Sequence, residues 1–303
     1  MPSSPGSEVA GATVKWSAVV VNHNAGDLLL ESVRSLVDDG AHEVVVVDNA
    51  SSDGSVDALE TVANAHDLPV AVVRAEANAG YAAGANLGIG HTDTEVVAVL
   101  NPDTRVSSGT GFALAAVFDD PSVAAAGPRV LNPDGTTYPS ARSVPSTLDA
   151  IGHGAFGLLW AGNPFTRRYR QTDVDPGVRR NVDWVSGAAM WLRRSALDEI
   201  GGWDEGYFMY VEDVDVCWRL RQAGWRIVYE PAGRVEHVQG TSTAQRPYRM
   251  LAAHHRSLLR FAAKRWRGFR RVLLVPAAGY LTLRALAAMA AHALRARSQA
   301  PRA

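Results

Sequence analysis

Three carboxylates crowd one short stretch of this sequence, and their spacing suits proton transfer. Glu212, Asp213 and Asp215 directly follow the aromatic and apolar run 207–211. An ionised carboxylate among apolar groups needs a partner, a cation or a proton-transfer role, because desolvation raises its pKa and costs free energy. We take Asp213 as a candidate general base, which could activate an alcohol as a nucleophile. Negative charge at a helix N-terminus is the alternative role for its two neighbours, and for Asp215 we prefer it.

A fourth carboxylate, Asp103, ends a different pattern. The apolar run 96–100 indicates a buried strand, and Asn101-Pro102-Asp103 follows it at once. Ligands of open α/β sheets bind outside the carboxyl ends of the strands. Asp103 is therefore a candidate ligand of a hard cation, Mg²⁺ or Mn²⁺, that bridges phosphate oxygens; capping the next segment is the alternative. The second Asn-Pro-Asp ends at Asp134 and precedes a glycine, which is turn chemistry, so we take it as structural.

Two further residues are candidates with open alternatives. His237 could complete the metal shell, because imidazole ligates Mn²⁺-type cations, although a single histidine is more often structural. Asp48 follows a strand pattern and precedes a helix, so it could contact a nucleotide base or ribose, or could cap the turn. A dinucleotide-binding Gly-x-Gly-x-x-Gly is absent after the first strand, where residues 22–26 read Asn-His-Asn-Ala-Gly, so a nicotinamide enzyme is disfavoured.

Strand and helix patterns alternate through the first half, which predicts an α/β fold with a mostly parallel sheet flanked by helices. The expected strands are 16–21, 44–47, 70–74, 96–100, 185–192 and 225–229. The first expected helix, 28–37, follows the first strand. A second begins at the capping loop 48–55 and ends near residue 65, and three more are expected at 78–88, 195–200 and 213–223. His237 is then expected on a loop.

Charge is distributed unevenly along the chain. The formal net charge is −1, yet from His237 to the end there are 13 Lys and Arg and no Asp or Glu, against 17 basic and 31 acidic residues before it. This asymmetry predicts an anionic partner for the tail: a lipid headgroup, a diphosphate or nucleic acid. Nucleic acid is disfavoured, because the tail lacks regularly interleaved aromatics. Cys217 is the only cysteine, which excludes an internal disulfide, and the first thirteen residues do not resemble a secretion signal, so we expect a cytoplasmic protein.

The apolar stretch 272–294 is a poor spanning helix, because Pro276, Arg284 and His292 interrupt it. With the basic residues just upstream it suits amphipathic helices lying on an anionic leaflet. A helical pair packed on the catalytic domain is the alternative. We expect a leader at 1–15, a catalytic domain at 16–240 and a basic helical extension at 241–303.

Five segments carry a resemblance to family 2 glycosyltransferases, in the order in which that family has them. They are 44–55 (VVVVDNASSDGS), 78–86 (NAGYAAGAN), 100–103 (LNPD), 184–194 (WVSGAAMWLRR) and 201–225 (GGWDEGYFMYVEDVDVCWRLRQAGW). Within the family, the sequence is most similar to bacterial rhamnosyltransferases that extend polyprenyl-diphosphate-linked glycans in cell-wall or surface-polysaccharide assembly.

The resemblance implies a GT-A fold, a metal-dependent inverting mechanism and a nucleoside-diphosphate-sugar donor. Carried over by residue, Asp48 would read the pyrimidine base, Asp103 and His237 would bind Mg²⁺ or Mn²⁺, and Asp213 would deprotonate the acceptor. The other expected donor-side residues are Asn22, Asn49, Asn78, Gly80, Asn86 and Asn101. The expected acceptor-side residues are Trp184, Glu212 and Arg219.

Two departures from the family pattern matter. Where many members have Asp-x-Asp, this chain has Asn101-Pro102-Asp103, which leaves one carboxylate for the metal and increases the need for His237. The Gln-x-x-Arg-Trp signature of processive synthases is also absent, so we expect one sugar to be added per encounter.

The expected reaction moves L-rhamnose from dTDP-rhamnose to a polyprenyl-diphosphate-linked acceptor on the inner face of the cell membrane. One alternative keeps the fold with another donor, such as galactofuranose, N-acetylglucosamine or another hexose. A second is a non-catalytic module that binds nucleotide sugar or lipid. The sequence leaves the oligomeric state open.

Overall fold

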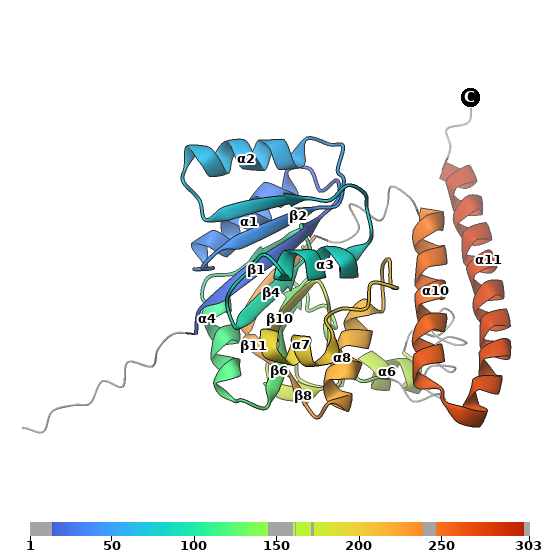
Figure 1. Ribbon diagram of the computed structural model, residues 1–303. Coiled ribbons are helices and arrows are strands. Elements are labelled where there is room, and N and C mark those ends of the chain that lie inside the picture. Colours follow the sequence, from blue (N-terminus) through green and yellow to red (C-terminus); the bar gives the residue numbers. More distant parts are fainter. Residues whose placement is uncertain (1–13, 145–159, 161, 171–172, 239–246, 300–303) are drawn as a thin grey trace, which may run out of the picture.

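The computed structural model describes residues 14–144, 160, 162–170, 173–238 and 247–299. Within these residues, nine strands form one sheet in the order β3-β2-β1-β4-β10-β6-β11-β5, with β8 beside β11 (Figure 1). The strands are β1 (Trp16–Asn22), β2 (Val44–Asp48), β3 (Val70–Arg74), β4 (Val96–Leu100), β5 (Thr104–Val106), β6 (Val123–Leu131), β8 (Arg180–Val182), β10 (Ala189–Arg193) and β11 (Arg226–His237). A separate two-stranded ribbon pairs β7 (Ala141–Arg142) with β9 (Trp184–Val185).

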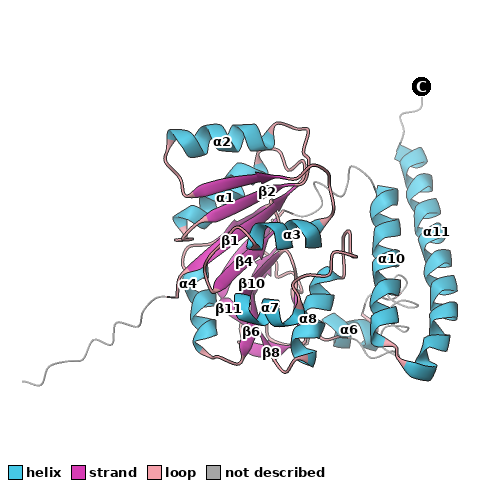
Figure 2. Cartoon of the chain, viewed as in Figure 1, coloured by secondary structure: helices cyan, strands magenta, loops and turns pink. Residues whose placement is uncertain are grey.

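Helices cover both faces of the sheet, because successive strand residues point to opposite sides and nearly all of them are apolar. Ala18 and Val20 join one core with α1, α2 and α4, whereas Val19 and Val21 join another with α3, α7 and α8. Figure 2 shows these helices around the sheet. The helices are α1 (Leu28–Asp38), α2 (Ser55–Ala65), α3 (Tyr81–Ile89), α4 (Thr110–Ala115), α6 (Pro164–Arg170), α7 (Arg194–Ile200), α8 (Glu212–Gln222), α10 (Pro247–Arg265) and α11 (Leu274–Gln299), with short 3₁₀ turns η1 (Ala116–Asp119) and η2 (Gly268–Leu273).

The first half of the sheet is parallel and places polar residues together at one edge. β3, β2, β1 and β4 run in the same direction, and the register pairs Asn22 with Asp48 at the carboxyl ends of β1 and β2. The next residues of the chain leave the sheet there. Asn49 and the Asn101 to Asp103 turn consequently lie at the same edge.

The second half of the sheet reverses direction and adds residues from far along the chain to that edge. β10 runs antiparallel to β4, so its amino end meets the carboxyl end of β4, and Asn101 N–H donates to Ala188 O at 3.0 Å. β11 carries a register irregularity between Glu230 and Arg234 and then pairs with β5. His237 pairs with Thr104 in that ladder. Because Thr104 directly follows Asp103, this pairing brings His237 close to Asp103.

Three sequence-based expectations need correction here. The strand expected at 185–192 is two strands, β9 and β10, because Ser186 N–H donates to Ser140 O and the chain bends at Gly187. The strand expected at 225–229 continues to His237, which is therefore the last residue of β11 and not a loop residue. Of the expected leader, only residues 14 and 15 are described, and Val14 packs against the core.

The basic extension forms two helices that lie side by side at one end of the molecule (Figure 1). α10 contacts the catalytic part: Phe261 is buried with Tyr207 and Val211. α11 packs on α10 and leaves apolar side chains in solvent, with Val275 77% and Leu283 70% exposed. Of the two alternatives for the tail, packing on the domain describes α10, while α11 presents apolar side chains to solvent. Among the described residues, no helix has the length and apolar character needed to cross a bilayer.

The close packing of α3 on the sheet gives a stability prediction. A Cβ on Gly88 would collide with a Val19 methyl and lie 2.9 Å from Val47 Cγ2. We expect Gly88→Ala to lower the free energy of unfolding by about 1–3 kcal/mol, because both valines belong to a filled core. Urea denaturation measures this change. Gly279→Ala on α11 is the matched control, since its Cβ would meet nothing within 4 Å, and it should be neutral or stabilising. Equal losses in both variants would contradict the packing argument.

Candidate active site

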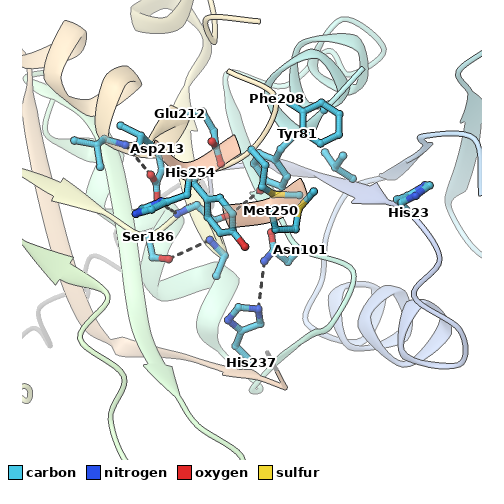
Figure 3. A pocket seen from close by; sticks show the side chains of 18 of the residues that line it. His23, Tyr81, Asn101, Ser186, Phe208, Glu212, Asp213, His237, Met250 and His254 are labelled. Carbon is cyan, nitrogen blue, oxygen red and sulfur yellow. Dashed lines mark hydrogen bonds between the residues drawn. The ribbon is translucent and has the colours of Figure 1, made fainter. Parts of the chain in front are cut away.

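A cavity of about 600 Å³ opens at the carboxyl edge of the parallel strands, a size suited to a small-molecule ligand (Figure 3). Its walls include the strand ends with Asn49 and the 101–103 turn, the start of α3, the start of α8, the β7–β9 ribbon and one face of α10. Asn101 and His237 lie together in Figure 3, and Glu212 and Asp213 lie across the cavity from them. Asp103 and Asp213 both line this one cavity.

The Asp103 carboxylate and the His237 imidazole converge on one point. His237 Nε2 lies 3.1 Å from Asp103 Oδ1 and 3.2 Å from Asn101 Nδ2, and Val238 N–H donates to Asp103 O at 3.0 Å. Both side chains are mostly buried, with 9% and 13% exposed for Asp103 and His237. The β11–β5 ladder fixes this pair, which is separated by more than 130 residues in sequence.

The pair fits a divalent cation. Two ligands at right angles around an octahedral Mg²⁺ are about 3 Å apart, which matches the observed separation of the two donor atoms. In the part of the chain that the structure describes, no group of three or more His, Cys, Asp or Glu side chains could hold a metal. The chain would therefore supply two ligands, and phosphate oxygens and water would complete the shell.

Asp213 is half-buried and held by the backbone. Its Oδ2 accepts from Gly187 N–H at 3.0 Å and its Oδ1 from Val214 N–H at 2.8 Å. The bend between β9 and β10 makes the first bond possible, because it turns the Gly187 N–H out of the sheet. Burial raises the pKa of Asp213, while the two N–H groups and the charge of Arg142 act in the opposite direction.

Glu212 lies beside Asp213 with fewer compensating groups. It is 7% exposed, and its Oε2 has no hydrogen-bond partner among the described residues. Burial first and the neighbouring Asp213 second raise its pKa well above the ordinary carboxyl value, and only its own backbone N–H acts in the opposite direction. Because the Gly187 and Val214 N–H groups and the charge of Arg142 offset the burial of Asp213, Asp213 is the carboxyl group of the pair that ionises more readily. This division of roles suits Asp213 as the base.

Arg142 is a site residue that the sequence analysis missed. β7–β9 pairing sets it opposite Trp184, and its guanidinium lies 5.0 Å from the Trp184 ring centroid. Nε donates to Pro139 O at 2.6 Å, and the guanidinium also donates to the Tyr138 hydroxyl at 2.8 Å. The surrounding sequence has no regular pattern. The only signal for a role was an arginine four residues after the aromatic residue Tyr138. Trp184, expected on the acceptor side, lines the cavity beneath this guanidinium.

On the side expected to bind the donor, several predicted residues line the cavity and hold one another. Asn49 Nδ2 donates to Gly80 O at 3.1 Å, and Gly80 N–H donates to Asn78 Oδ1 at 3.0 Å. Gly80 has φ of +98°, and a Cβ there would collide with Phe208 O, so only glycine fits. His23 also lines this part, with Nδ1 2.9 Å from Asn49 O. The predicted role of these residues in donor binding stays a prediction.

Two predicted donor residues lie behind the cavity wall. Asn22 is fully buried, and its amide donates to Ser51 and Ser55 hydroxyls at 3.1 and 3.2 Å. Asp48 accepts from Ser51 N–H at 3.2 Å and lies 3.7 Å from Arg74. Asn22 does not line the cavity, and its hydrogen bonds support the loop after β2; its expected contact with the donor stays a prediction. For Asp48 the expected contact with the base stays a prediction.

Two other expected site residues also lie outside the cavity. Asn86 joins α3 to the loop before α8: it donates to Trp203 O at 2.9 Å and accepts from Trp203 N–H. Arg219 donates to Asp215 at 2.7 Å and to Ile200 O at 2.8 Å. Neither residue lines the cavity, and these hydrogen bonds give both a supporting position in the structure. Asp215 lies in the first turn of α8, as we preferred, and it is also fully buried in an ion-pair network with Arg219 and Lys264.

The interpretation of Asp134 as a turn residue agrees with the structure. Asp134 lies in a turn in which its carboxylate accepts from Thr136 N–H at 2.9 Å. Five residues of the cavity wall come from α10, which the sequence analysis did not place at the site: Arg249, Met250, His254, Leu258 and Phe261. No local signal could have placed them there, because their sequence pattern is that of any amphipathic helix.

A mostly parallel sheet with polar strand ends facing a buried carboxylate is the arrangement of a glycosyltransferase with the GT-A fold. The sequence profile described as glycosyl transferase family 2 matches residues 17–201. The chain is 40% identical over 250 residues to the N-acetylglucosaminyl-diphospho-decaprenol L-rhamnosyltransferase of Mycobacterium tuberculosis. The matched region covers 79% of this chain and 80% of that relative. The protein therefore belongs to glycosyl transferase family 2 and is a glycosyltransferase.

Solved structures support the fold. One is the mannosyltransferase PcManGT from Pyrobaculum calidifontis in complex with GDP-Man and Mn²⁺. The match covers 94% of this chain and 79% of that chain, with a TM-score of 0.57 and 18% identity. GalNAc-T7 with UDP, GalNAc and Mn²⁺ covers 74% of this chain and 43% of its own, with a TM-score of 0.57 and 19% identity. The expected GT-A fold is confirmed.

The electrostatics of the acidic pair predict a pH effect. Asp213 acts as a base only when ionised, and Arg142 lowers its pKa. Arg142→Met should therefore raise that pKa and move the acid limb of kcat/KM to higher pH, with a larger loss of activity below neutrality than above it. The pH dependence of sugar transfer measures this shift.

Two variants test the assignment of charge within the pair. Arg142→Lys keeps a cation and should move the acid limb less than Arg142→Met does. Glu212→Gln should leave the limb in place, because Glu212 is already neutral when Asp213 ionises. A limb that moves in Glu212→Gln but not in Arg142→Met would mean that the two carboxyl groups have exchanged roles.

Proposed function

We propose that this glycosyltransferase moves L-rhamnose from dTDP-rhamnose to a polyprenyl-diphosphate-linked glycan, with inversion at the anomeric carbon. The M. tuberculosis relative, whose name specifies L-rhamnosyl transfer to N-acetylglucosaminyl-diphospho-decaprenol, supports the sugar and the acceptor class. The observation that carries the chemistry is that the Asp103–His237 pair and the half-buried Asp213 carboxylate share one cavity. A donor that carries another hexose is the alternative. The dTDP part of the donor belongs to the same proposal as the sugar.

The residues of the cavity divide the reaction between two sides. Asp213 accepts the acceptor hydroxyl proton as that oxygen forms its bond to the anomeric carbon, and the bond from this carbon to the diphosphate oxygen breaks. Gly187 and Val214 N–H groups fix the Asp213 carboxylate for this transfer. One displacement from the face opposite the leaving group inverts the anomeric configuration. In this proposal Glu212 stays protonated, so it adds no second negative charge beside the base.

Asp103 and His237 would hold Mg²⁺ or Mn²⁺, which, when bound, offsets the charge that develops on the leaving diphosphate. The spacing of their donor atoms supports this proposal, as does the Mn²⁺ in two solved structures with this fold. Asn101, whose amide contacts His237, would orient the imidazole. Asn49, Asn78 and Gly80 would form the donor side, with Asp48 reaching the base of the nucleotide.

The extension would place the enzyme on the cytoplasmic face of the membrane. η2 and the start of α11 expose Phe269 at 86%, Val272 at 70% and Val275 at 77%, next to the exposed Arg270 and Arg271. Apolar side chains beside cations suit an anionic lipid surface, where the side chains enter the interface and the cations contact headgroups. A lipid-linked acceptor would then meet the cavity wall formed by α10.

Transfer activity tests the central proposal. With Mn²⁺ or Mg²⁺ and a lipid-diphosphate-linked N-acetylglucosamine acceptor, the purified protein should release dTDP from dTDP-rhamnose and form a rhamnosylated lipid. Asp213→Asn should lower kcat by about 10²–10⁴-fold with the donor Kd little changed. Asp103→Asn should instead weaken metal-dependent donor binding, measured by calorimetry with and without a chelator.

The outcomes separate the alternatives. Release from a different nucleotide sugar, with none from dTDP-rhamnose, would overturn the donor and keep the transferase. Donor binding without release in any combination, with Asp213→Asn indistinguishable from the unmodified protein, would indicate a non-catalytic binding module. Full activity in the presence of a strong chelator would overturn the metal.

Vesicle binding tests the membrane proposal. The protein should sediment with vesicles that contain phosphatidylglycerol, bind less to pure phosphatidylcholine, and dissociate as salt rises. Changing Phe269, Val272 and Val275 together to Ser should weaken binding by about tenfold or more, because each apolar side chain contributes its transfer free energy. Phe112→Ser is the matched control, since Phe112 is 64% exposed on α4, far from this surface in sequence. Equal binding of all variants would overturn the proposal.

A further inference from the structure

The segment that leads into the proposed base has an unusual backbone. Tyr210 and Val211 have φ of +68° and +71°, the only consecutive non-glycine residues with positive φ in the part of the chain that the structure describes. Val211 is β-branched, for which this conformation is an outlier. Such a conformation persists only where the surrounding structure enforces it. Glu212 and Asp213 follow directly as the first two residues of α8, so this backbone sets their direction.

α10 contacts every residue of the 207–211 segment. Ser257 Oγ donates to Met209 O at 3.0 Å. The His254 ring meets the Tyr210 ring edge to face at 5.3 Å, and the Arg249 guanidinium lies 4.8 Å from the Phe208 ring centroid. Tyr207, Val211 and Phe261 form one buried apolar cluster. Burial lowers the pKa of His254 to about 4, so its ring is neutral and packs as an aromatic group.

An ion-pair network fixes the same helix to α8. Asp215 is fully buried and accepts from Lys264 Nζ at 2.8 Å, from Arg219 Nε at 2.7 Å and from the Tyr207 hydroxyl at 3.1 Å. Lys264 also pairs with Asp204, and so does Arg260, at 2.7 Å. Asp215 lies two residues after the proposed base, so Lys264 ties the first turn of α8 to α10.

The other side of the segment rests on the expected donor side. Tyr81 N–H donates to Phe208 O at 2.9 Å, and Gly80 approaches the Phe208 backbone so closely that no Cβ would fit. The 207–211 segment is therefore held between α3 and α10. Without α10, one side of a strained segment loses its support, and the segment can relax to ordinary φ values and reorient the start of α8.

We infer that α10 is a positioning element for catalysis: it holds the 207–211 segment so that the Asp213 carboxylate faces the cavity, and Ser257 and Lys264 are its positioning residues. This inference rests on the proposed role of Asp213 as the base. It gives the extension a part in turnover that is separate from membrane attachment, because these contacts lie on the domain side of α10 and not on the exposed surface of α11.

Kinetics of the full-length protein test this role. Ser257→Ala and Lys264→Met should each lower kcat by about tenfold or more, because a displaced base reduces turnover, with the donor Kd and donor KM changed less than about threefold. The conservative variants Ser257→Thr and Lys264→Arg should keep most of the turnover. Arg256→Ala is the matched control, since Arg256 is exposed on the same helix, and it should leave kcat unchanged.

A compensating change separates positioning from a general loss of structure. Glycine adopts positive φ without strain, so adding Val211→Gly to Ser257→Ala should raise kcat about threefold or more above that of Ser257→Ala alone. A stabilising role alone predicts the opposite, because Val211→Gly also removes a buried side chain. Thermal unfolding of each variant accompanies the kinetics.

Two results would overturn the inference: unchanged kcat in both Ser257→Ala and Lys264→Met, or a fall in kcat matched by an equal loss of donor affinity with no recovery by Val211→Gly. The Asp213→Asn variant is measured beside them. If it alone loses turnover, this inference fails and the proposed base stands. If Asp213→Asn keeps full turnover, the proposed base fails.

Discussion

The burial of Asp213 is the constraint on which the rest of the site depends. A carboxylate taken out of water resists ionisation, so a buried base needs compensation that the protein must supply locally. Two backbone N–H groups and the charge of Arg142 provide this compensation. One of these N–H groups belongs to Gly187, which lies in the break between β9 and β10. The neighbouring Glu212 has only its own backbone N–H to offset its burial, so its pKa lies well above the ordinary carboxyl value.

The sheet supplies the opposite wall by topology. Its parallel half ends at one edge, where the chain leaves β4 through Asn101 and Asp103. The antiparallel strand β10 and the long strand β11 then bring the chain back to this edge, and the β11–β5 ladder sets His237 against Asp103. Where many relatives in the family have a second aspartate, this chain thus has an imidazole from a distant strand, a substitution that keeps two ligands for a cation in the proposed site.

The C-terminal extension joins both sides of the site. α10 forms part of the cavity wall and grips the strained segment before the base, while α11 presents apolar side chains to solvent. One helical pair can therefore bring the proposed lipid-linked acceptor and the base to the same place. This arrangement accounts for the uneven charge of the chain: the arginines of the tail serve the proposed membrane surface, and Arg260 and Lys264 neutralise buried or half-buried aspartates of the catalytic part.

The sequence alone determined the fold, because its local patterns of apolar and capping residues match the strands and helices of the parallel half closely, and its motifs identified the family. It also singled out Asp103 and Asp213, because carboxylates at strand and helix ends are costly to bury, and the structure places both, with His237, around one cavity. Only the tertiary structure showed that Asn86 and Arg219 support the site from behind, that Asp215 is an ion-pair centre, and that Arg142 and α10 belong to the cavity. These features depend on strand register and helix docking between segments far apart in the chain, and no local pattern of residues encodes such distances.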